Sequence, residues 1–146
     1  MPDDPFDLER FVIKQDEEVA GVTEYDRALS ELRDGQKRTH WIWFVFPQVA
    51  GLGRSELATR YAIGSADEAR AYLAHPVLGP RLLECCDAIL GADGDSATEI
   101  LGEPDDLKLR SSMTLFARVG GGRVFRDVLD RFFSGEEDER TIERLT

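Results

Sequence analysis

The chain has 146 residues, of which 42% are hydrophobic and 32% charged, and its formal net charge is −11. This length suits one domain over residues 1–146. A chain of this mass can bury about two-thirds of its surface, so a core needs neither disulfides nor metal. The acidic excess argues against nucleic-acid partners, because affinity for a phosphate backbone comes from cations that displace its counterions.

Neither a leader nor a membrane span is expected. Segment 1–10 carries acids and no apolar stretch, so it is no signal peptide. The longest strongly apolar run, residues 41–46, is far shorter than the roughly 20 residues that cross a bilayer. We therefore expect a soluble, cytoplasmic protein with no membrane partner, and its oligomeric state stays open.

Metal and cofactor sites are not expected either. The only cysteines, Cys85 and Cys86, are adjacent and cannot chelate a metal alone, and the only histidines are His40 and His75. The acidic runs lack EF-hand spacing. We interpret the cysteines as reduced thiols on a helix.

Residues that favour helix starts precede several apolar stretches with helical spacing. These start signals are Asp4–Pro5, Thr23, Ser55, Ser65, Ser96 and Pro104. Residues that end helices follow, namely Gly35, Pro76, Gly91, Gly120–Gly122 and Gly135. The sequence predicts an all-α fold, a compact single-domain array of about seven to nine short helices.

Two segments leave an alternative open. Residues 40–46, rich in aromatic and β-branched side chains, could form a buried strand. Residues 114–119 and 123–128 flank three glycines and could form a hairpin. Helix is favoured in both places, because the rest of the chain offers few alternating runs to pair with a strand.

The segment Gly-Leu-Gly-Arg-Ser at 51–55 precedes a predicted helix. Glycines let the backbone approach a ligand, and amides at a helix start favour an anion. The guanidinium of Arg54 can add two parallel hydrogen bonds to such an anion. A tight turn followed by Ser55 as an N-cap explains the same residues more simply.

Further polar candidates follow. His40 and Gln48 border the aromatic run 41–46, in which most side chains should be core while Trp41 could still line a pocket. Arg81 stands at the start of a long helix, where a surface ion pair is its default role. Ser111 and Ser112 share a helix face with Lys108, but their order reverses the S-x-x-K motif, so we do not expect a serine nucleophile.

The segments HWIWFVFPQVAGLGRS, YAIGSADEARAYLAHPVLGPRL and GEPDDLKLRSSMTLF resemble a bacterial family, the domain-of-unknown-function 1810 family. The resemblance covers nearly the whole chain and implies a compact helical domain. Some members carry the name calpastatin, which does not suit a dense globular chain. The polar positions that match the family motifs, with two aromatic neighbours, are His40, Gln48, Ser55, Arg81, Lys108, Ser111, Ser112, Trp41 and Tyr61.

The leading hypothesis is a helical ligand-binding module for a small anionic or nucleotide-like molecule. Arg54, Arg81 and Lys108 would meet the anion, and Trp41 would stack on a base. The alternative is a hydrolase that cleaves a glycosidic bond of a nucleotide derivative, with His40 or a nearby carboxylate as general acid or base. A non-catalytic protein-interaction scaffold is the third interpretation, and the sequence leaves open whether there is any catalysis.

Overall fold

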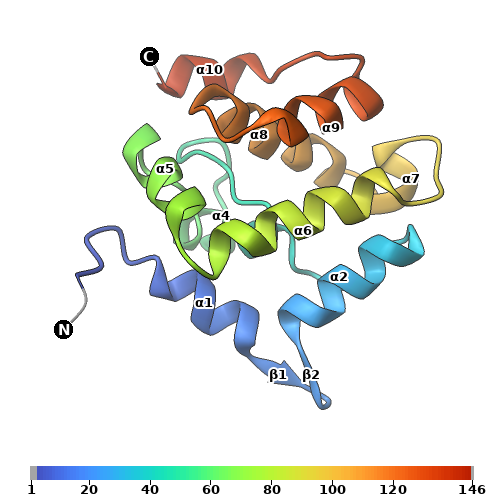
Figure 1. Ribbon diagram of the computed structural model, residues 1–146, viewed down its shortest axis with the longest axis horizontal. Coiled ribbons are helices and arrows are strands. Elements are labelled where there is room, and N and C mark those ends of the chain that lie inside the picture. Colours follow the sequence, from blue (N-terminus) through green and yellow to red (C-terminus); the bar gives the residue numbers. More distant parts are fainter. Residues whose placement is uncertain (1–2, 146) are drawn as a thin grey trace.

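The computed structural model describes residues 3–145, and helices dominate this part of the chain (Figure 1). It contains ten helices, seven of them with seven or more residues, and one two-stranded sheet. In chain order the elements are α1 (Glu9–Asp16), β1 (Glu18–Val19), β2 (Val22–Thr23), α2 (Glu24–Asp34), α3 (Ile42–Val45), α4 (Glu56–Arg60), α5 (Ala66–Ala74), α6 (Leu78–Leu90), α7 (Ala97–Leu101), α8 (Asp105–Arg118), α9 (Arg123–Phe133) and α10 (Glu139–Leu145). The predicted all-α fold is confirmed.

Capping residues explain the starts of α2, α4, α5 and α7 and the end of α2. The hydroxyl groups of Thr23, Ser55, Ser65 and Ser96 each accept a hydrogen bond from the backbone N–H three residues later. These bonds satisfy amides that the first helical turn leaves without partners. Gly35 ends α2 with a φ of 75°, a conformation that glycine adopts without strain.

The predicted start of the first helix at Asp4–Pro5 is wrong. The helix begins at Glu9, because Asp7 has a φ of 52° and interrupts it. Asp4 still acts as a cap: its carboxylate accepts hydrogen bonds from the backbone N–H of Leu8, at 2.7 Å, and of Glu9, at 3.0 Å.

Neither ambiguous segment forms a strand. Within residues 40–46, Ile42–Val45 forms the short helix α3. Residues 114–118 lie in α8 and residues 123–128 in α9, so they do not form a hairpin. The small hairpin β1–β2, which we did not predict, joins α1 to α2. Its strands have two residues each, too few to show an alternating pattern.

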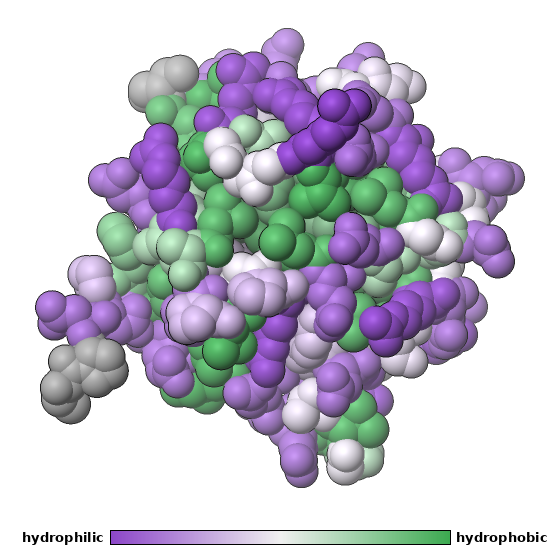
Figure 2. All heavy atoms as spheres, viewed as in Figure 1, coloured by the Kyte–Doolittle hydropathy of each residue, from purple (hydrophilic) through white to green (hydrophobic). Residues whose placement is uncertain are grey.

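Helix α6 lies across the middle of the molecule and packs against α2, α5 and α9 (Figure 1). Buried apolar side chains from α1, α2, α3 and α5–α9 form one core cluster. Polar side chains cover much of the face seen in Figure 2, with apolar atoms exposed in a band across its middle. Among residues 3–145, no helix is long and apolar enough to cross a membrane.

Arg131 of α9 closes the C-terminal end of α6. Its guanidinium donates hydrogen bonds to the backbone oxygens of Ile89, Leu90, Ala92 and Gly94. The last carbonyls of a helix have no intrahelical donors, so this side chain supplies partners that the helix itself cannot provide. It also joins two helices that are about 40 residues apart in the sequence.

Candidate functional site

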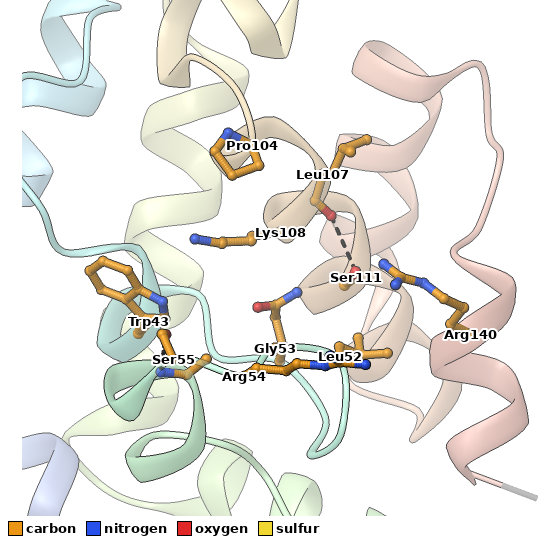
Figure 3. Close-up of a pocket in the computed structure, with 12 residues that line it drawn as sticks. Trp43, Leu52, Gly53, Arg54, Ser55, Pro104, Leu107, Lys108, Ser111 and Arg140 are labelled. Atoms are coloured by element: carbon orange, nitrogen blue, oxygen red, sulfur yellow. Dashed lines mark hydrogen bonds between the residues drawn. The ribbon is translucent and has the colours of Figure 1, made fainter.

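A cavity of about 290 Å³ lies between the loop that follows α3, the helix α4, the start of α8, and α10 (Figure 3). We call it the α8 pocket. Its lining residues are Trp43, Gln48, Leu52, Gly53, Arg54, Ser55, Ala58, Pro104, Leu107, Lys108, Ser111 and Arg140.

Backbone contacts fix the loop that forms one wall of the α8 pocket. The amide of Ile63 donates to the oxygen of Gln48, and the amide of Ala50 donates to the oxygen of Ile63, both at 2.8 Å. At Gly53 the loop passes so close to α4 that an added Cβ would lie 2.6 Å from the Cβ of Ala58. Only glycine allows this approach, so part of the predicted glycine-rich cradle has a packing reason.

Lys108 reaches the pocket from the second turn of α8. Its ammonium lies 4.7 Å from the ring centroid of Trp43, and Figure 3 shows the two side chains facing each other. It also lies 3.3 Å from a carboxylate oxygen of Asp105. The other oxygen of Asp105 is 2.8 Å from the ammonium of Lys37, whose side chain is nearly buried. Asp105 therefore pairs with two lysines, and the three side chains together keep one net positive charge.

Two arginines complete the positive lining. Arg54 is exposed and, within residues 3–145, has no hydrogen bond or ion pair. Arg140 comes from α10, and its Nε lies 3.9 Å from a carboxylate oxygen of Asp138. The α8 pocket thus receives cations from a loop and from two helices.

Five of the ten predicted site residues line this pocket. They are Gln48, Arg54, Ser55, Lys108 and Ser111. Ser55 caps α4, as the simpler interpretation holds, and still lines the cavity. Ser111 donates from its hydroxyl towards the oxygen of Leu107, at 3.2 Å, and towards Asp138, at 2.9 Å.

The prediction that Trp41 forms the aromatic wall is wrong. Trp41 is fully buried, and its indole N–H donates to Glu31 at 2.9 Å. Trp43, two residues further on, lines the α8 pocket instead. Side chains two positions apart on a helix do not share a face, so only one of the two indoles can face the cavity.

Arg81 does not join the pocket cations. Its guanidinium donates to Gln15 at 3.1 Å and to Asp16 at 2.8 Å, and lies 4.7 Å from the ring centroid of Tyr25. These partners are on α1 and α2, which explains why the arginine is held there. The predicted gathering of Arg81 with Arg54 and Lys108 is therefore wrong.

Three further predicted residues lie outside the α8 pocket. His40 is exposed ahead of α3 and is not part of the lining. Tyr61 is buried against the rings of Phe11 and Phe44. Ser112 is fully buried, and its hydroxyl, like the indole N–H of Trp43, has no hydrogen-bond partner among the described residues.

A known protein family and a solved structure both match this chain. The profile of a family described as "Protein of unknown function (DUF1810)" matches residues 5–145. The chain belongs to the DUF1810 family. It is also similar to the crystal structure of the conserved hypothetical protein Rv1873 from Mycobacterium tuberculosis, with 53% sequence identity and a TM-score of 0.90, over 97% of this chain and 98% of that one. No curated protein matches it.

Among the lining residues of the α8 pocket that were not predicted, two carry a charge or an aromatic ring, namely Trp43 and Arg140. Trp43 belongs to the aromatic run in which we expect most side chains to be core, but its place two residues after Trp41 on a predicted helix indicates that the two side chains point in different directions. Arg140 lies in an acidic C-terminal segment with no motif around it. Only the packing of α10 beside α8 brings it to the cavity.

The lining of the α8 pocket suits ligand binding better than proton transfer. The lining residues include cations, an amide, two hydroxyls and an indole, but no carboxylate, imidazole or thiol. Residues 3–145 also contain no group of three or more His, Cys, Asp or Glu side chains that could hold a metal ion. The arrangement can attract an anion and donate hydrogen bonds to it.

Proposed function

We propose that this protein binds a small anionic metabolite, such as a sugar phosphate or a mononucleotide, in the α8 pocket. The observation that carries the proposal is the charge of the lining: Arg54, Lys108 and Arg140 surround one cavity in a chain whose net charge is −11. A local positive field inside an acidic molecule raises the local concentration of small anions and disfavours cations.

The size of the cavity supports a small ligand. Its volume, about 290 Å³, lies just below the roughly 300–1,000 Å³ that is typical of small-molecule sites. Leu52, Leu107 and the indole of Trp43 provide apolar surface beside the cations. A compact phosphorylated metabolite therefore suits the site better than an extended dinucleotide.

The composition of the pocket favours binding over hydrolysis. Hydrolysis of a glycosidic bond needs a general acid or base close to the reacting atoms, and His40 is not among the lining residues. The only carboxylate in contact with Lys108 in the described chain, that of Asp105, is also paired with Lys37. We therefore assign the pocket a binding role.

Thermal unfolding and calorimetric titration test the proposal. Ribose 5-phosphate and AMP should raise the Tm, because a ligand that binds only the native state stabilises it by mass action, whereas ribose and adenosine should not. Lys108→Met and Arg54→Gln should each weaken binding about tenfold or more, as expected when a charged hydrogen-bond donor is removed. Analysis of the recovered ligand should find it unchanged.

Arg123→Gln provides the matched control, because this arginine is 90% exposed and lies on α9, away from the pocket. Its affinity should equal that of the wild type. The proposal fails if no phosphorylated compound raises the Tm, which would favour an interaction scaffold. It also fails if Lys108→Met binds as tightly as the wild type. Turnover of AMP would favour the hydrolase.

A further inference from the structure

The three cations of the α8 pocket come from three separate parts of the chain. Arg54 stands in the loop before α4, Lys108 on α8, and Arg140 on α10. Figure 3 shows Lys108 and Arg140 on different sides of the pocket. A planar carboxylate has two oxygens, which a single arginine fork can satisfy. Donors from three directions instead suit a tetrahedral group with three terminal oxygens.

The ion pairs around Lys108 keep the pocket positive. Asp105 would neutralise Lys108 if the two were alone, but Lys37 lies closer to this carboxylate, at 2.8 Å against 3.3 Å. The side chain of Lys37 is 7% exposed, and its ammonium lies 5.3 Å from the ring centroid of Trp41. Because Lys37 shares Asp105 with Lys108, the three side chains keep one net positive charge, and Lys108 brings this charge to the lining of the pocket.

Building on the proposed function, we propose that the α8 pocket selects the dianionic phosphate group of a phosphate monoester over singly charged anions. A phosphate monoester carries a charge of about −1.5 to −2 at neutral pH and presents three acceptor oxygens. We expect Arg54, Lys108 and Arg140 to contact this group from different sides, because they line the pocket from three parts of the chain. A sulfate ester has the same three terminal oxygens but a single charge, so it separates charge from shape.

The test compares ribose 5-phosphate with ribose 5-sulfate, and AMP with adenosine 5′-sulfate, by calorimetric titration near neutral pH. In each pair of compounds that binds, the phosphate should bind about tenfold or more tightly than the sulfate, because its second negative charge also interacts with the three cations. Equal affinity of phosphate and sulfate would overturn the selection for a dianion while leaving the anion-binding function intact. Loss of all binding would instead count against the proposed function itself.

Two variants locate the source of the selection. Arg140→Gln and Lys37→Met should each reduce the ratio of phosphate affinity to sulfate affinity, although Lys37 does not line the pocket. A residue with a purely structural role would change both affinities equally, so the ratio isolates the electrostatic effect. Arg123→Gln, the exposed control on α9, should leave the ratio unchanged. A wild-type ratio in both Arg140→Gln and Lys37→Met would contradict the assignment of these cations.

Discussion

Glu31 is a buried carboxylate that organises the chain ahead of the site. It accepts hydrogen bonds from the amides of Arg38 and Thr39, from the hydroxyl of Thr39, and from the indole N–H of Trp41. Burial alone would raise the pKa of Glu31, but these hydrogen bonds outweigh it and hold the pKa below the usual glutamate value. The ionised form therefore stabilises the folded state.

Replacing this carboxylate should make stability less dependent on pH. We expect Glu31→Gln to lower the free energy of unfolding by about 1.5–3 kcal/mol near pH 7, because the donors lose a charged acceptor. The contribution of Glu31 is present above the glutamate pKa of the unfolded chain and is lost as the pH falls through its lower folded pKa. Urea unfolding at about pH 7 and about pH 3 measures the difference, which should shrink in acid.

Glu18→Gln is the control for this prediction, since Glu18 is exposed on β1. It should change the free energy of unfolding by less than about 0.5 kcal/mol. An equal penalty for Glu31→Gln at both pH values would show that ionisation of Glu31 is not the cause.

At the scale of elements, one aspartate links the start of α10 to α8. Asp138 accepts hydrogen bonds from the hydroxyls of Ser111, at 2.9 Å, and Thr141, at 2.6 Å, while its own amide donates to Thr114. With seven residues, α10 is too short to be stable as an isolated helix. These bonds to α8 therefore hold the helix that carries Arg140.

Removing this carboxylate should loosen α10 specifically. We expect Asp138→Ala to lower the free energy of unfolding by about 1–3 kcal/mol and to speed amide hydrogen exchange over residues 139–145. Phosphate-monoester affinity should fall with it, because Arg140 is then less well placed. Glu136→Ala, which removes a side chain that is 74% exposed, should leave exchange unchanged. Unaltered protection of α10 in Asp138→Ala would refute this role.

Helix boundaries could be predicted where the signal is local, and not where it is tertiary. Thr23, Ser65 and Ser96 cap the helices they were expected to start, because a hydroxyl and an amide three residues away need no other part of the chain. The start of α1 was missed because Asp7 adopts a positive φ. No motif of the sequence indicates that conformation at an aspartate.

The same limit applies to the whole molecule and its pocket. Polar residue type and local position were enough to find five lining residues: Gln48 borders the aromatic run, Arg54 and Ser55 follow glycines, and Lys108 and Ser111 share a helix face. Arg140 reaches the pocket only because α10 packs on α8, and Arg81 is held by α1 instead. Such choices among ion-pair partners follow from helix packing, which spacing along the chain does not contain.

The two cysteines report on global unfolding. Cys85 and Cys86 are fully buried in the core on α6, and burial raises the pKa of Cys85 to about 12 and that of Cys86 well above its usual range. Because the thiolate is the reactive form, both should resist alkylation in the folded protein. We expect labelling by iodoacetamide, followed by mass spectrometry, to match the rate or population of global unfolding. Labelling of one thiol well before the other would show local opening of α6.

The guanidinium that closes the end of α6 has an evolutionary consequence. Because Arg131 supplies donors to carbonyls between positions 89 and 94, the connection to α7 requires no capping side chain of its own. Homologous sequences should diverge at 93 and 95 while retaining arginine at 131, whereas position 94 should stay glycine because an added Cβ would lie 2.9 Å from Cγ1 of Ile100. Lysine at that position would be a poor replacement. The two terminal nitrogens of the guanidinium contact different pairs of backbone oxygens, and a single ammonium cannot reach all of them.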